Sequence, residues 1–162
     1  MKNNKRIALL GVLAALAIIL SYLESLIPPL VAMPGVKMGL ANIAVMYALF
    51  KLGFSNAFFI SLVRNIAIFL LFGGFIALLY SVAGAALSLC VMCLLKRFSP
   101  FTELGVSVAG GVTHNFAQIL VAIFMFSTSS LILYLPILVV SGALAGIVIG
   151  ICSSIVIKKV KF

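Results

Sequence analysis

Apolar residues fill long uninterrupted runs along the chain, and short clusters of charged residues, glycine or proline separate these runs. The runs show neither the alternation of a membrane barrel strand nor the polar stripe of a water-exposed helix. Runs of roughly 15 to 25 residues have the length of helices that cross a bilayer. The pattern therefore predicts an all-α integral membrane protein, with a single six-helix domain over residues 1–162. The predicted transmembrane spans are 7–26, 39–51, 54–72, 75–95, 104–126 and 131–157.

The second predicted span is unusually short. Residues 40–50 supply only a narrow apolar core, so this segment must lie where the membrane is thin or be covered by neighbouring helices. Before it, Pro28, Pro29 and Pro34 cannot continue a helix. Residues 27–38 are therefore predicted to form a stiff, apolar outer loop that is able to close over a cavity.

Composition and charge agree with this prediction. Hydrophobic residues make up 65% of the chain and charged residues 8%, whereas water-soluble domains are about half apolar. In a six-span topology every basic residue except Lys37 and Arg64 falls on one side, which the positive-inside rule makes cytoplasmic. Both termini are then inside. The net charge of +9 indicates topology and contact with anionic lipid headgroups, and no nucleic-acid partner is expected.

A small set of polar residues lies within the apolar spans. Arg64 falls near the middle of the third span and His114 near the middle of the fifth. Gln118 follows His114 by one turn on the same helix face, whereas Asn115 lies about 100° around the helix. Nearer the outer surface, the predicted topology places Asn42, Lys37 and Glu24, and Asn65 adjoins Arg64. We expect these residues to form a polar, ligand-binding column from the outer surface to the middle of the membrane.

Arg64 needs a partner, because a charged side chain at the centre of a bilayer costs at least several kcal/mol. The chain has only two acidic residues, Glu24 and Glu103, and the helical rise places each about 15 Å or more in depth from Arg64. Two interpretations stay open. Carbonyl groups and neighbouring amides satisfy the guanidinium, or an anionic ligand from the outer side completes its contacts.

The single histidine, His114, also has two interpretations: a hydrogen-bonded packing residue or a contact to a ligand. Neither gives it a catalytic duty, so no catalytic residue is expected. A metal site is not expected either, because the chain has one histidine and no aspartate.

Small residues at four-residue spacing predict close helix approach. Gly142, Gly146 and Gly150 repeat along the sixth span, where packing inside the bundle is favoured. Gly11 and Ala15 repeat along the first span, where docking of a partner protein is a competing interpretation.

Several short motifs stand out along the chain: Leu23-Glu24, Pro34-Gly35-Val36-Lys37-Met38-Gly39, Ala41-Asn42, Val63-Arg64-Asn65, Ser81-Val82-Ala83-Gly84 and His114-Asn115-Phe116-Ala117-Gln118. Together they resemble the bacterial membrane family known as heptaprenyl diphosphate synthase component I, also called the Gx transporter family. The family is similar to the substrate-binding S-components of energy-coupling factor (ECF) transporters, six-helix proteins that dock onto a transmembrane coupling subunit and ATPases. The resemblance implies residence in the bacterial cytoplasmic (inner) membrane, and it assigns docking to the first helix, where Gly11 and Ala15 stand in place of an Ala-xxx-Ala pattern.

The two family names imply different functions. Prenyl synthases hold magnesium with Asp-rich motifs, and this chain has no aspartate and no P-loop, so we expect no enzyme activity and no cofactor. The favoured hypothesis is an S-component-like membrane subunit that takes up a small anionic, vitamin- or isoprenoid-related molecule. The alternatives are a non-catalytic membrane component of heptaprenyl diphosphate synthesis for the menaquinone side chain, and a membrane partner of extracytoplasmic redox or flavin-modification machinery.

Overall fold

The computed structural model describes residues 3–27, 39–98 and 101–160, and every regular element within these residues is a helix. Five of the helices are long and apolar enough to cross a membrane, which confirms the predicted all-α, multi-pass membrane class. The elements are α1 (Asn3–Ser25), α2 (Asn42–Lys51), α3 (Phe54–Phe72), α4 (Phe75–Phe98), α5 (Glu103–Phe126), the 3-10 helix η1 (Ser129–Tyr134) and α6 (Leu135–Lys159).

Most helix limits agree with the prediction to within a few residues, and α3 agrees at both ends. The main difference is α2, which begins at Asn42 and has only 10 residues. At 1.5 Å per residue it is about 15 Å long, roughly half the thickness of the hydrocarbon core. By itself α2 is therefore too short for the transmembrane span predicted over 39–51.

The other differences arise at helix ends. α1 begins at Asn3 and α4 continues to Phe98, because Lys and Arg, which ended the predicted spans, are good helix formers. α6 begins only at Leu135, since the residues before it form η1.

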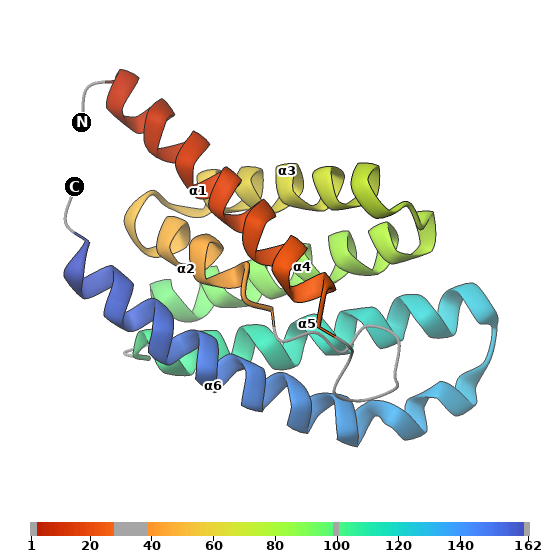
Figure 1. Ribbon diagram of the computed structural model, residues 1–162. Helices are drawn as coiled ribbons and strands as arrows, with labels where there is room; N and C mark the ends of the chain where they lie inside the picture. Colours follow the sequence, from red (N-terminus) through yellow and green to blue (C-terminus); the bar gives the residue numbers. More distant parts are fainter. Residues whose placement is uncertain (1–2, 28–38, 99–100, 161–162) are drawn as a thin grey trace.

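The long helices surround α2. α5 packs along α6 and against α4, and α3 joins α4 to α1. α2 contacts α1, α3 and α6, so it lies inside the bundle (Figure 1). The covering by neighbours predicted for this short segment is therefore what the structure shows.

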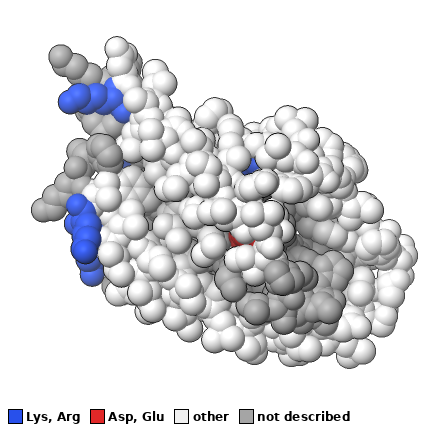
Figure 2. All heavy atoms as spheres, in the orientation of Figure 1, with Lys and Arg blue, Asp and Glu red and all other residues white. Residues whose placement is uncertain are grey.

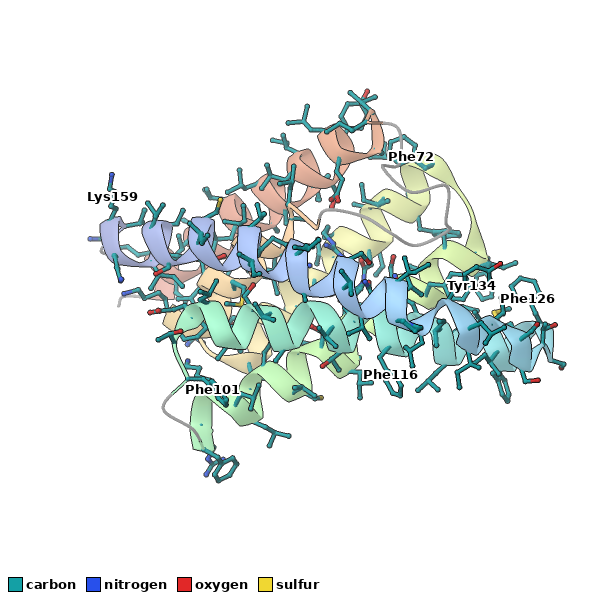
Figure 3. All side chains as sticks on the ribbon, turned by 90° about the horizontal axis from the view of Figure 1, so that it is seen from below. Phe72, Phe101, Phe116, Phe126, Tyr134 and Lys159 are labelled. Carbon is teal, nitrogen blue, oxygen red and sulfur yellow. The ribbon has the colours of Figure 1, made fainter. Side chains whose placement is uncertain are left out.

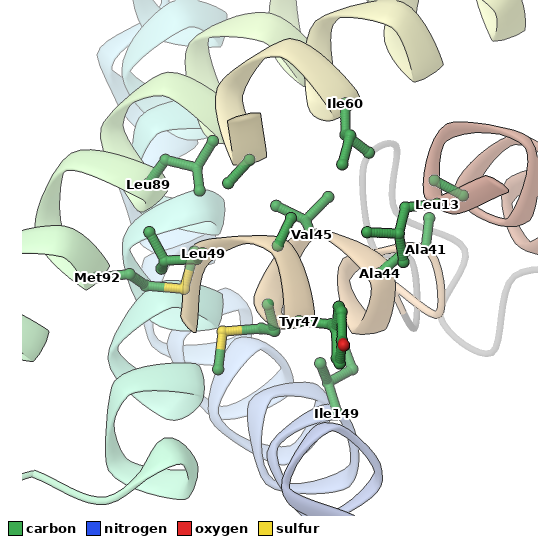
Figure 4. Packing of buried hydrophobic residues seen from close by; sticks show 14 of the residues in the cluster. Leu13, Ala41, Ala44, Val45, Tyr47, Leu49, Ile60, Leu89, Met92 and Ile149 are labelled. Carbon is green, nitrogen blue, oxygen red and sulfur yellow. The ribbon is translucent and has the colours of Figure 1, made fainter. Parts of the chain in front are cut away.

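The hydrophobic core forms around α2. Its residues from Ala44 to Leu49 are all buried, so these two turns leave no face for solvent or lipid. Figure 4 shows Val45 and Leu49 among residues of the surrounding helices, including Ile60 of α3, Leu89 of α4 and Ile149 of α6. A helix that is apolar on all sides is stable in a protein core or in a bilayer, and α2 is buried in the core.

α5 and α6 approach each other backbone to backbone. A Cβ atom at Gly146 would lie 2.6 Å from Val108 Cα, and one at Gly142 would lie 2.7 Å from the Gly111 carbonyl oxygen. Only glycine allows helices this close. The small residues of the sixth predicted span thus serve packing inside the bundle, as favoured from the sequence.

Charged residues gather at one end of the molecule, which carries Asn3 and Lys159 and is called the terminal end here. Figure 2 shows most of the visible Lys and Arg side chains at this end. At the opposite end, called the far end, Figure 3 shows Phe72, Phe126 and Tyr134. Aromatic residues are frequent where membrane helices meet water, and basic residues mark the cytoplasmic side. The charge distribution is therefore the one expected of a membrane protein whose terminal end faces the cytoplasm.

Lys96 of α4 holds the last turn of α2. Its Nζ atom donates to the carbonyl oxygens of Leu49 and Phe50 at 2.8 and 3.3 Å, and it lies 5.2 Å from the centre of the Phe50 ring. The last carbonyl groups of a helix have no partner within the helix, and a cation there also interacts favourably with the negative end of the helix dipole. Lys96 therefore fixes the C-terminal end of α2.

Lys96→Met should lower the free energy of unfolding by about 0.5 to 1.5 kcal/mol, because it removes both hydrogen bonds and the contact with the Phe50 ring. Thermal unfolding in detergent measures the effect. Lys158→Met, at an exposed position of α6, is the matched control. Equal melting temperatures for the two variants would show that Lys96 does not stabilise α2.

Candidate functional site

A cavity of about 460 Å³ lies inside the bundle, and α1 to α6 all contribute to its wall. It exists because α2 begins only at Asn42, partway along the longer helices, so that Asn42 and Met46 line the space beyond its first turn. The volume is in the range of small-molecule binding sites, which are about 300 to 1,000 Å³. The cavity is thus the candidate functional site.

Arg64 projects from the middle of α3 into this cavity and is only 9% exposed. Its Nε and Nη2 atoms donate to Asn65 Oδ1 at 3.2 and 2.7 Å, and Nη1 donates to Asn42 Oδ1 at 3.4 Å. Two amides of the predicted polar column therefore hold the guanidinium. Both are neutral acceptors, so the positive charge stays uncompensated by these contacts.

The guanidinium keeps hydrogen-bonding capacity beyond these bonds. It has five N–H donors, and the described residues accept three of them. A carboxylate or phosphate group is the natural partner for two further donors in this planar fork. Arg64 is thus oriented by protein and still able to bind an anion.

Glu24 and Arg64 line the same cavity, and hydrogen bonds through Gly39 and Asn42 link them. The depth difference of about 15 Å expected from the sequence assumed helices parallel to one axis. Figure 1 shows that α1 crosses the bundle obliquely and ends partway along the α5–α6 pair. Most of its last turn is exposed, whereas Glu24 is partly buried.

The Glu24 carboxylate also binds the chain just before α2. Its Oε1 atom accepts a hydrogen bond of 2.5 Å from the backbone N–H of Gly39. This bond connects the end of α1 to the entry of α2. Glu24 is therefore both a cavity residue and a link between two helices.

His114 and Gln118 lie one turn apart on α5, as predicted, and both line the cavity. Gln118 Nε2 lies 3.2 Å from His114 Nε2, so the amide can donate to the ring when its proton is on Nδ1. The ring packs on Gly84 of α4, where an added Cβ atom would lie 2.7 Å from His114 Cε1. A hydrogen bond also joins these two helices, since Ser88 Oγ donates to the Gly110 carbonyl at 2.9 Å.

Asn115 lines the cavity too, but its amide group serves helix packing. Its Nδ2 atom donates to the Leu138 carbonyl at 2.7 Å and lies 3.3 Å from Ser141 Oγ, both in α6. Asn115 lies about 100° around the helix from His114, as the helical spacing predicts, and its side chain therefore contacts α6. Among the predicted ligand contacts, Asn115 is the one most clearly engaged in joining two helices.

The remaining predicted residues lie elsewhere. Lys37 lies outside the described residues, as does all of the predicted outer loop 27–38 except Ile27. Gly11 and Ala15 are exposed on the face of α1 that points away from the bundle, and no atom lies within 4 Å of a Cβ added at Gly11. In the described part of the structure Gly11 and Ala15 are therefore available to lipid or to a partner protein.

Sequence reasoning missed the hydroxyl groups and the apolar part of the wall. Ser21, Tyr80 and Ser81 line the cavity, as do the apolar side chains of Ile68 and Phe69. Ser21 precedes Glu24 by three residues, the spacing of one helix face, which is a signal that could have found it. The described part of the wall thus offers one cation, one carboxylate, several neutral polar groups and an apolar surface.

Comparison with known proteins identifies one relationship. A family model described as heptaprenyl diphosphate synthase component I matches residues 13–156, nearly the whole chain. No curated protein and no solved structure gives a significant match. The matched region includes every described residue that lines the cavity.

Gly84→Ala should displace the His114 ring from Gln118 and lower the free energy of unfolding by about 1 to 3 kcal/mol, because the new methyl group overlaps the ring. The protein has one histidine, so its imidazole NMR signals report the displacement directly. Gly11→Ala, where the added methyl group meets nothing, should leave both measurements unchanged. An unmoved imidazole signal in Gly84→Ala would contradict this packing.

Proposed function

The chain belongs to the heptaprenyl diphosphate synthase component I family, and from this premise we propose that it is a non-catalytic membrane subunit that captures a small, anion-bearing molecule in its cavity. We further propose that the molecule enters from the side opposite the basic terminal end, and that the chain acts in uptake in the manner of an S-component. The observation that carries the proposal is Arg64, a buried cation held in place by neutral amides at the wall of the cavity.

The energetics of Arg64 favour binding over a purely structural role. A guanidinium away from bulk water is stabilised by hydrogen bonds, and among the described residues two neutral side-chain oxygens accept three of its five N–H groups. An arriving anion supplies both a charge and acceptors. The incomplete set of acceptors from the described residues therefore supports a ligand site.

The other walls of the cavity suit a molecule with an apolar body. His114 and Gln118 offer directional hydrogen bonds, while Ile68, Phe69 and Ile149 offer apolar contact. Binding sites for small molecules commonly combine a mainly apolar wall with a few placed polar groups. Such a wall supports a vitamin-like or isoprenoid-related molecule with one anionic group.

A second candidate function follows from the family description, in which the word component points to a partner. In this case the chain is a membrane accessory to a separate prenyl diphosphate synthase, and the cavity receives the diphosphate group of an isoprenoid. The chain has no aspartate with which to hold magnesium, so in this case too the catalyst is the partner. Both candidates require Arg64 to bind an anion.

Arg64→Ala should weaken binding of the captured molecule by about ten- to a hundred-fold, because a charge-assisted contact is worth about 1.5 to 3 kcal/mol. His114→Ala and Gln118→Ala should each weaken it less, since a neutral contact is worth about 0.5 to 1.5 kcal/mol. Native mass spectrometry of the gently extracted protein shows which small molecule each variant retains.

Arg97→Ala is the matched control, because Arg97 is exposed at the end of α4. Thermal unfolding of the ligand-free variants separates binding from folding. If Arg64→Ala retains the molecule at wild-type affinity, the proposed site is wrong. If His114→Ala lowers the melting temperature sharply while the surviving fraction keeps its affinity, the histidine is a packing residue.

The exposed face of α1 provides the test between uptake and synthesis. Gly11→Leu should abolish co-purification of a transmembrane coupling subunit and its ATPases, because a large side chain prevents close approach of a second helix. Binding of the small molecule to the isolated protein should persist. Val12→Leu is the control, because Val12 is exposed on α1 and its replacement removes no small residue.

Co-purification of a soluble, Asp-rich prenyl synthase in place of ATPases would support the second candidate. Equal loss of partner and small molecule in Gly11→Leu would indicate a folding defect and contradict the docking role of α1.

A further inference from the structure

Two opposite charges share the cavity. Among the described residues that line it, Glu24 and Arg64 are the ones that carry a formal charge when the histidine is neutral. The described wall is therefore electrically neutral as a whole. A carboxylate in the wall opposes the binding of a simple anion, because like charges repel.

One turn of the chain holds both charges. Gly39 N donates to Glu24 Oε1, and Asn42 Oδ1 accepts from Arg64 Nη1. Gly39 and Asn42 are joined in the same turn, since Asn42 N donates to the Gly39 carbonyl at 2.8 Å. The turn 39–42 therefore fixes where the carboxylate and the guanidinium stand relative to each other.

The conformation of this turn depends on glycine. Gly39 has φ +74°, a region that L side chains rarely adopt, and a Cβ there would meet Asn42 Nδ2 at 3.0 Å. The spacing of the two charges is therefore set by a specific backbone geometry.

Each charged group keeps part of its hydrogen-bonding capacity. Gly39 N donates to Oε1 of Glu24, and no described residue donates to Oε2. Arg64 likewise has donors left after its bonds to Asn42 and Asn65. The cavity thus presents an acceptor with negative charge and a donor with positive charge at separate points of its wall.

We propose that the cavity selects a small zwitterion, whose anionic group binds Arg64 and whose cationic group binds Glu24. This inference rests on the proposed function and narrows its substrate class. A zwitterion compensates both wall charges and brings no net charge into a site of low dielectric constant. A simple anion would meet Arg64 favourably but leave the cavity with a net negative charge beside Glu24.

Three compounds of one skeleton test the proposal: phenylalanine, which is a zwitterion, 3-phenylpropanoate, which is an anion, and 2-phenylethylamine, which is a cation. Saturation-transfer difference NMR in detergent detects their binding to the full-length protein. Wild type should prefer phenylalanine over each of the other two by about tenfold, the scale expected of one unpaired charge.

Charge-neutral variants should change this preference in opposite directions. In Glu24→Gln, which keeps an acceptor oxygen for Gly39 N, the anion should bind at least as well as the zwitterion. In Arg64→Gln, the cation should bind at least as well as the zwitterion. Glu103→Gln, in the first turn of α5 and outside the cavity wall, is the matched control and should behave as wild type.

Glu24→Asp separates charge from structure, because it keeps the charge and shortens the side chain that reaches Gly39. It should retain the wild-type order of the three compounds even where its melting temperature falls. Loss of that order in Glu24→Asp, with folding intact, would overturn the inference.

Failure of the inference differs from failure of the proposed function. If wild type binds the anion as well as the zwitterion, and only Arg64→Gln weakens the anion, the cavity is an anion site and the zwitterion inference is wrong. If Arg64→Gln changes the binding of none of the compounds, or none binds to wild type and variants, the proposed anion site is wrong as well.

Discussion

The length of α2 is the constraint on which the rest of the molecule depends. A helix of 10 residues cannot cross a bilayer, and one that is apolar on all sides cannot face water, so the longer helices must enclose it. The enclosed helix α2 fills the centre of the bundle only at the terminal end. Toward the far end the same space is left to a cavity, and the first turn of α2 lies at its wall with Asn42 and its hydrogen bond to Arg64.

The close contact of α5 and α6 complements this arrangement. Gly142 and Gly146 remove the side chains that would separate the two helices, so that these helices form one continuous support. Asn115 then joins them through the Leu138 carbonyl at the level of the cavity. A wall stiffened in this way can hold His114 and Gln118 in a fixed position, which is what directional binding of a small molecule requires.

The sequence could predict which residues lie close together within one helix, but not how residues of different helices are placed. His114 and Gln118 share a helix, so the regular rise and rotation were enough to place them on one face. Arg64 and Asn65 are neighbours in the chain, and their proximity was equally secure. The relation of Glu24 to Arg64 was harder to predict, because the tilt of α1 is set by packing against other helices and has no local signature.

The surroundings of α2 show a second limit of prediction from the sequence. Its apolar character and small size were visible in the sequence, and the need for covering neighbours could be predicted, but not which helices would cover it. α6 is among them, and Tyr47 Oη donates to the Val160 carbonyl at 3.5 Å, across 113 positions of the chain. The ribosome therefore makes α2 long before it makes α6, and until then one side of this apolar helix has no permanent partner. The core and the cavity are completed in the same late step of biogenesis, when α6 closes over both.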